Sequence, residues 1–179
     1  MHRSHLIAVV LTVTALAGAP SLASAQSPPA RPAAITLAHQ ASVLAVPKFI
    51  FHAGLAFGAF HHFIYLPFKA GKFTSGSFLS KLKNYAEAGV AALFVYHETK
   101  LALADAQQNK VLKVLVSPLT AVVAVFNTIV SKVKGHGLDP ATISSAQNSI
   151  TSLESEAKAS GSAVSEAIPS AKQILAGSA

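Results

Sequence analysis

The chain alternates long apolar stretches with short segments rich in glycine and proline, and the apolar stretches have the periodicity of helices. The clearest pattern covers residues 110–134, where one set of polar residues lies within about 60° of a single line along a helix. Most of the remaining helix surface is apolar. The set comprises Lys113, Ser117, Thr120, Asn127, Thr128, Ser131 and Lys134. Pro118 interrupts this segment, so either Ser117 caps a new helix or one helix kinks there, and the unbroken polar stripe favours the kink.

Two further long helices are expected upstream of this segment. Residues 78–107 form the first, whose polar positions fall within an arc of about 60°; they are Ser80, Asn84, Glu87, Glu98 and Asp105. Residues 49–66 form the second, which is apolar on all sides and which Pro67 should end. A shorter helix is expected over residues 36–46, with Pro47 ending or kinking it.

Small residues within the apolar segment 49–66 predict a close contact. Gly54 and Gly58 are four residues apart and therefore lie on one face of a helix. A pair of this kind lets a neighbouring helix approach its backbone closely.

The C-terminal third predicts an outer helix. Gly135 and Gly137 end the preceding helix, and Asp139 with Pro140 provides an N-cap acid followed by proline at the first helical position. A narrow apolar seam follows, formed by Ile143, Ala146, Ile150, Leu153 and Ala157. The sequence shows no sustained strand alternation, so the predicted fold class is all-α, a small bundle of about four helices.

The N-terminus has the features of a secretory signal peptide. Arg3 precedes a twelve-residue, mainly apolar run, which is too short to span a bilayer of roughly 30 Å comfortably. Ala23 and Ala25 are the small residues that a signal peptidase recognises, so cleavage is expected between Ala25 and Gln26. The processed protein of 154 residues would then be secreted or held in the cell envelope. An uncleaved membrane anchor is the alternative.

These patterns predict four segments along the chain. Residues 1–25 are the signal peptide, and residues 26–34, with three prolines, form an extended tether. Residues 35–168 form the helical domain. Residues 169–179 are expected to be a flexible tail.

Composition narrows the possible chemistry. Hydrophobic residues make up 51% of the chain and charged residues only 12%, which is unusually apolar for a soluble protein. There is no cysteine, which excludes disulfides, zinc–thiolate sites and c-type haem attachment. Removal of Met1 with the signal peptide would also exclude a thioether copper site.

Charge is distributed unevenly. Residues 48–134 contain ten lysines and three acidic residues, whereas residues 135–179 contain two lysines and four acidic residues. In an exported protein, such a basic region points to anionic lipid or another anionic envelope surface as partner, and not to nucleic acid. The alternative is that the lysines simply form a solvated face.

A small integral membrane protein is a second possible reading. Residues 49–66 and 114–131 are each eighteen residues long, or about 27 Å as helices, and a lysine-rich loop separates them. Against it stand three histidines in the first segment and the polar stripe in the second. A bundle of apolar helices buries all of these faces at once and is favoured.

Histidines are the only residues that suggest a metal or bis-histidine haem site, and His52, His61, His62 and His97 are its possible ligands. Their spacing does not favour it. His52 and His62 are about 15 Å apart along a helix, and adjacent His61 and His62 diverge by about 100°. A hairpin turning near Gly71 would place His97 opposite residue 45. No cofactor is therefore expected.

Catalytic motifs are also missing from the sequence. There is no nucleophile elbow, phosphate-binding glycine loop or cysteine nucleophile, and the seven acidic residues are dispersed. We therefore expect a non-enzymatic protein of the cell envelope that acts by binding or as a structural component.

Overall fold

The computed structural model describes residues 33–178, with side chains from residue 43 onward. All regular structure in this part is helical, which confirms the all-α prediction. The elements are α1 (Ala33–Phe60), the π-helix η1 (His61–Tyr65), α2 (Leu66–Lys69), α3 (Phe78–Gln108), the 3-10 helix η2 (Leu112–Leu115), α4 (Val116–Lys134), α5 (Pro140–Ala159) and α6 (Ala171–Gly177). The predicted signal peptide, its cleavage site at Ala25 and most of the tether lie outside the described residues.

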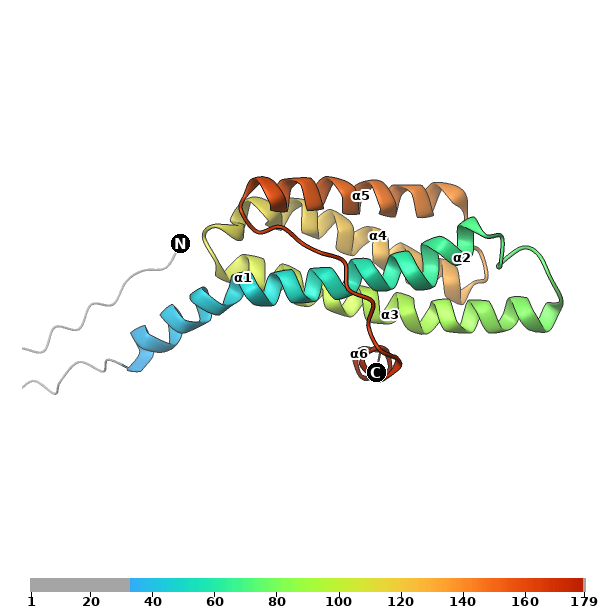
Figure 1. Cartoon of the computed structure of the whole chain (residues 1–179), viewed down its shortest axis with the longest axis horizontal. Helices are drawn as coiled ribbons and strands as arrows, with labels where there is room; N and C mark the ends of the chain where they lie inside the picture. The colour runs from blue at the N-terminus through green and yellow to red at the C-terminus, as the bar shows by residue number, and fades with distance from the viewer. Residues whose placement is uncertain (1–32, 179) are drawn as a thin grey trace, which may run out of the picture. The chain divides into compact units, whose positions relative to one another are not determined.

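The helices form a bundle in which neighbours in sequence are neighbours in space (Figure 1). α1 packs along α3, α3 along α4, and α4 along α5, while the short α6 lies against α3. Phenylalanines fill the centre, and the fully buried ones are Phe49, Phe57, Phe60, Phe94 and Phe126. Burial of each such ring contributes roughly 1.5–3 kcal/mol, so the aromatic segment of α1 serves mainly as core.

α1 is longer than the sequence predicts. It runs through Pro47 without ending there, and Figure 1 shows its first turns at an angle to the rest. The predicted stop at Pro67 is wrong: the backbone widens into the π-helix η1 and continues into α2, where Pro67 occupies the first turn. Pro67 is tolerated because N–H groups in the first turn of a helix have no intrahelical partner to lose. Pro47, in contrast, lies in the interior of α1, and the helix continues through it.

α4 begins without the Ser117 cap that was one of the two possibilities at Pro118. A 3-10 turn passes directly into the α-helix at Val116, and Leu115 at the N-cap position provides no side-chain cap. Pro118 therefore lies in the first turn of α4. The predicted polar stripe is exposed along its whole length, which confirms the orientation of this helix; it comprises Lys113, Ser117, Thr120, Asn127, Thr128, Ser131 and Lys134.

α5 follows the sequence prediction closely. Asp139 accepts a hydrogen bond from the Thr142 backbone N–H at 2.9 Å, and Pro140 is the first helical residue. All members of the apolar seam are buried, namely Ile143, Ala146, Ile150, Leu153 and Ala157. The helix packs on α4, as an outer helix should.

An extended segment joins α5 to α6, and we call residues 162–170 the strap. It crosses α1 (Figure 1), and the Ala167 N–H donates to the carbonyl oxygen of Gly54 at 3.0 Å. Gly54 and Gly58 thus allow the extended strap to approach the backbone of α1, whereas the sequence predicted that a neighbouring helix would pack there. Beyond it, where a loose tail was expected, α6 begins at the capping box of Ser170 and Gln173.

Candidate functional site

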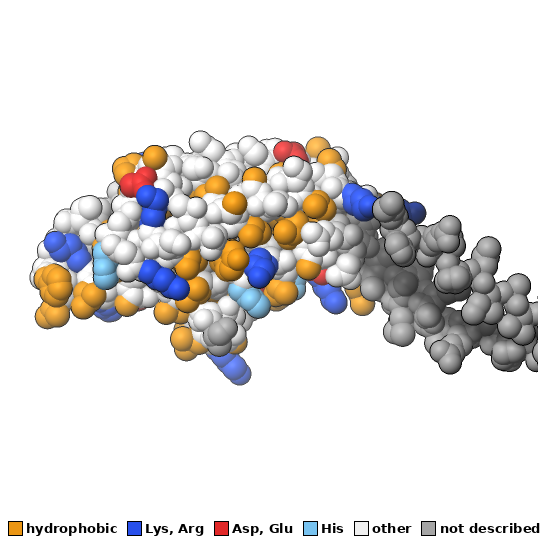
Figure 2. All heavy atoms as spheres, turned by 180° about the vertical axis from the view of Figure 1, so that it is seen from behind, with side chains coloured by type: hydrophobic (Ala, Val, Ile, Leu, Met, Phe, Trp, Pro, Cys, Tyr) orange, Lys and Arg blue, Asp and Glu red, His pale blue; other side chains and the backbone are white. Residues whose placement is uncertain are grey.

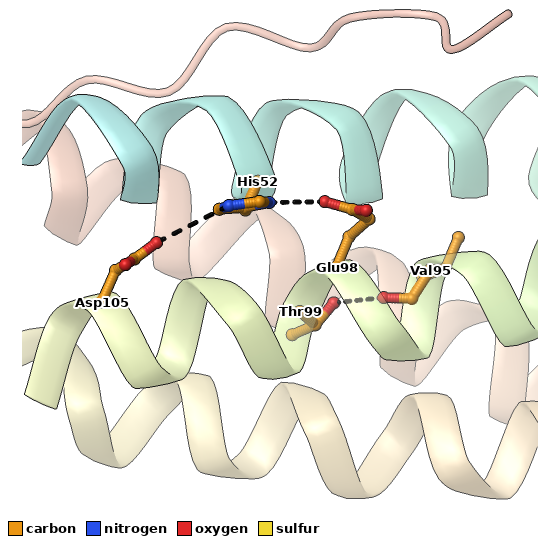
Figure 3. Close-up of polar contacts among 5 residues, drawn as sticks. All are labelled: His52, Val95, Glu98, Thr99 and Asp105. Carbon is orange, nitrogen blue, oxygen red and sulfur yellow. Dashed lines mark hydrogen bonds and ion pairs between the residues drawn. The ribbon is translucent and has the colours of Figure 1, made fainter. Parts of the chain in front are cut away.

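A cluster of one histidine and two carboxylates joins α1 to α3 (Figure 3). His52 Nδ1 lies 2.6 Å from Glu98 Oε2, and His52 Nε2 lies 3.9 Å from Asp105 Oδ2. Glu98 and Asp105 are seven residues apart, or two helical turns, so α3 presents both carboxylates to the same side. The imidazole therefore lies between two acidic groups, with one ring nitrogen directed at each.

The cluster is set in a largely apolar interface. Glu98 is only 7% exposed, and the neighbouring Thr99 is fully buried, with its hydroxyl donating to the Val95 carbonyl oxygen at 2.7 Å. Burial raises the pKa of the Asp105 carboxyl, and the nearby His52 and Lys48 oppose this shift. Asp105 Oδ2 accepts no hydrogen bond from the described residues. The group thus acts as a polar link between two helices in a poorly solvated place.

A second histidine–carboxylate contact holds the strap. His61 Nδ1 in η1 lies 3.2 Å from Glu166 Oε2. Glu154 on α5 interacts electrostatically with both groups. Its own burial and the negative charge of Glu166 raise the pKa of the Glu154 carboxyl, whereas the nearby His61 lowers it. This arrangement attaches the strap to η1, near the C-terminal end of the first helical segment.

The structure does not bring the four histidines of the predicted metal site together. His52 and His61 face separate carboxylates, while His62 and His97 are exposed. In the described part of the chain, no three His, Cys, Asp or Glu side chains are grouped so that they could hold a metal ion. The metal or haem hypothesis therefore has no geometric support and stays a prediction.

The turn between α1 and α3 is centred later than the sequence suggested. Contact between His52 and Glu98 places the middle of the hairpin near residue 75, and not near Gly71. That shift brings Glu98, the neighbour of His97, opposite His52. His97 itself points outward.

Two surface hollows lie away from the His52 cluster. One, of about 530 Å³, lies between α3 and α6, and its lining is apolar except for one acid: Phe63, Ala86, Glu87, Val90, Ala91, Ala171, Ile174 and Leu175. The other, of about 390 Å³, is lined by Phe78, Lys81, Leu82, Tyr85 and His136. Neither is lined by His52, Glu98 or Asp105, so these titratable groups do not face a substrate-sized cavity there.

Two helical stretches are long and apolar enough to cross a membrane, judged by length and composition alone. They are Val43–Lys69 and Leu112–Lys134, and the most apolar windows within them are 56% and 33% buried inside the bundle. Core helices of soluble proteins pass the same test.

Comparison with known proteins gives no relative: no protein family, no curated protein and no solved structure matches this chain. The fold and the site therefore have to be interpreted from their own geometry.

Sequence reasoning missed the partners of the two histidines. A signal existed for the first contact, because Glu98 and Asp105 share one face of a helix whose neighbouring positions are apolar. The second contact joins residues 105 positions apart through an extended segment, for which no periodicity exists.

Proposed function

We propose that this chain is an exported, non-enzymatic helical protein of the cell envelope, and that it acts by binding to an anionic surface. The proposal depends chiefly on how the bundle distributes charge between its interior and its surface. It also draws on the N-terminal features of a signal peptide, which lie in the part of the sequence without a structural description.

Acidic and basic side chains in residues 48–134 are separated between inside and outside. Of the three acids in this range, Glu98 and Asp105 point into the interface with α1, and Glu87 pairs with Lys83 at 3.7 Å. Most of the ten lysines are exposed, and in the described residues only Lys83 and Lys132 lie within ion-pair distance of a carboxylate. The outer surface of this half is therefore positive, which attracts anionic partners.

The exposed face of α4 supports a bundle whose surface is in water. Polar side chains line this face from Lys113 to Lys134, whereas lipid would favour apolar ones there. Because the buried face of α4 packs on α3 and α5, both faces of the helix have suitable surroundings without a membrane.

A small membrane protein with two spans is the alternative, because the stretches Val43–Lys69 and Leu112–Lys134 are each long enough to cross a bilayer. In that case the polar stripe of α4 would have to face other protein or a water-filled space.

Export and fractionation of the full chain in a bacterial host test the proposal. We expect an intact mass that corresponds to loss of residues 1–25, and release of the processed protein from envelopes by high salt or alkaline carbonate without detergent. Recovery of the unprocessed chain in the cytosol would contradict export. A strict need for detergent would favour the two-span alternative.

A further inference from the structure

Large apolar side chains are exposed at the start of α3. Phe78 is 75% exposed, Leu79 74% and Leu82 44%, and we call these three residues the apolar tip. The first turns of α3 extend past the end of α5 (Figure 1), so the tip stands clear of the outer helix. Exposed apolar groups gathered in one place are unfavourable in water and are typical of interaction sites.

Lysines flank the apolar tip on both sides. At about 100° per residue, Phe78, Leu82 and Leu79 span about 100° of the helix surface. Lys81 lies about 60° to one side of this arc, and Lys83 lies about 40° beyond the other. Figure 2 shows orange side chains at the left end of the molecule with blue lysines beside them.

The surrounding chain is mainly basic. Residues 66–86 include Lys69, Lys72, Lys81 and Lys83 and no acidic residue, and the next residue, Glu87, pairs with Lys83 at 3.7 Å on the exposed surface. The hollow of about 390 Å³ at this end has Phe78, Leu82 and Tyr85 among its walls and Lys81 and His136 as its polar members. The Tyr85 and His136 rings are in edge contact, with centroids 4.9 Å apart. An apolar hollow with a basic edge suits a phosphate headgroup and the start of its acyl chains.

We propose that the apolar tip docks this protein on an anionic lipid bilayer. Phe78, Leu79 and Leu82 enter the boundary between headgroups and acyl chains, while the four lysines contact lipid phosphates. Lysine side chains suit this position because their aliphatic stems lie along apolar surface while the ammonium group stays in water. This inference rests on the proposed function and assigns both the surface and the partner.

A bilayer explains the tip better than other anionic partners do. A wall polymer or nucleic acid would be bound by the lysines alone and would leave the phenylalanine and leucines in water. A bilayer offers negatively charged headgroups to the lysines and, directly beneath them, an apolar interior to the side chains of the apolar tip.

Vesicle flotation tests the inference with the processed protein recovered by export. Vesicles of phosphatidylcholine alone are compared with vesicles that also contain 30% phosphatidylglycerol. The tip variant carries Phe78→Ser and Leu79→Ser. The matched control carries Ile168→Ser and Leu175→Ser, which alter two apolar side chains that are each 65% exposed in the acidic C-terminal region, residues 135–179. Circular dichroism verifies that both variants remain folded.

We expect the unaltered protein to bind the anionic vesicles and to be released by salt. The tip variant should bind at least about tenfold more weakly, since burial of each large apolar side chain contributes strongly, and the control should bind within about twofold of the unaltered protein. A second variant, Lys81→Gln with Lys83→Gln, should bind the anionic vesicles about tenfold more weakly, and its remaining binding should depend less on salt.

The possible failures are distinguishable. Equal binding by the tip variant and the unaltered protein would overturn the assigned surface and leave the proposed function intact. Binding to delipidated envelopes but not to anionic vesicles would overturn the choice of lipid. Absence of binding to both would contradict the proposed function as well.

Discussion

Glu98 is the only acidic side chain among the buried residues that the structure describes, and His52 is the group that makes this burial tolerable. A carboxylate in an apolar interface is costly unless it receives a hydrogen bond from a partner that can also carry positive charge. Here the partner comes from another helix, so the contact also fixes the register of α1 against α3. At the scale of single residues, the histidine is therefore a structural group.

Replacement of His52 by alanine should leave the buried Glu98 carboxylate without its hydrogen bond to the imidazole. We expect the free energy of unfolding to fall by about 2 kcal/mol, the usual cost of losing a hydrogen bond to a charged group. Addition of Glu98→Gln should recover part of the loss, because a neutral amide is less costly to bury than an unpaired carboxylate. Urea denaturation monitored by circular dichroism measures both variants.

His97→Ala is the matched control for this prediction, because His97 is exposed and directly precedes Glu98 in α3. It should change the free energy of unfolding by no more than about 0.5 kcal/mol. A loss in His52→Ala no larger than that in His97→Ala would contradict the assigned role.

Asp105 should make stability depend on pH in a definite direction. Because burial raises its pKa above the ordinary value of 3.8, the folded state holds the proton more tightly than the unfolded state does. Its contribution is therefore fully present below the unfolded pKa and is lost as pH rises through the folded pKa. Asp105→Asn abolishes this titration.

The measurement is the difference in unfolding free energy between Asp105→Asn and the unaltered protein, followed from about pH 3 to about pH 7. We expect this difference to shift in favour of the variant as pH rises. A shift in favour of the unaltered protein would mean that attraction to His52 and Lys48 outweighs burial.

At the scale of elements, glycines decide where the strap can lie. A Cβ atom built on Gly54 would come within 2.5 Å of the Ser165 carbonyl oxygen, and one on Gly58 would overlap the backbone of Ala167. Backbone atoms cannot rotate away as a side chain can. The strap can therefore keep its position only if both residues lack a side chain.

Gly58→Ala should displace the strap. Alanine gains about 1 kcal/mol of helix propensity over glycine, but overpacking against backbone typically costs about 1–3 kcal/mol. We expect net destabilisation and faster hydrogen exchange at the Ala167 amide, whose donor bond to Gly54 would open.

Gly89→Ala is the control at a second glycine inside a helix, because its Cβ would meet only the Val133 side chain, at an ordinary 3.5 Å. It should be neutral or stabilising by up to about 1 kcal/mol. Equal effects of the two substitutions would show that the strap does not depend on Gly58.

Helix boundaries were predictable where capping residues and apolar periodicity were both present in the sequence. They were less predictable where contacts with other parts of the fold determine the boundary. The Asp139 cap, Pro140 and the apolar seam located α5 correctly, because each acts within one or two turns. Pro67 was misleading because a proline is tolerated inside a continuous helical segment when the adjacent backbone adapts, here through η1. Of the two outcomes predicted for Pro47, an end or a kink, the end is wrong, because α1 continues through this residue. The strap has no periodic pattern and could not be found this way.

For the whole molecule, the helical periodicity of the apolar segments led correctly to a helical bundle but left its interior contacts open. The periodicity fixed which face of α4 is polar, whereas the His52–Glu98 contact depends on the length of the turn between α1 and α3. A shift of a few residues in that turn changes every partner across the interface. Composition alone also leaves open whether α1 and α4 are covered by protein or by lipid.

The central claim is that the apolar faces of these helices are buried against one another while the polar stripe of α4 faces water. Absence of cysteine from the chain provides a clean background for thiol labelling. Asn127→Cys places a thiol on the exposed stripe, and Val122→Cys places one at a position that is 1% exposed. The two sites lie on the same helix, so each serves as the reference for the other.

The decisive measurement is the rate at which a membrane-impermeant maleimide modifies these two thiols in the exported protein without detergent. We expect rapid modification at position 127 and protection at position 122 until denaturant is added. Protection at position 127 that detergent relieves would place α4 in lipid and would show that its polar stripe does not face water.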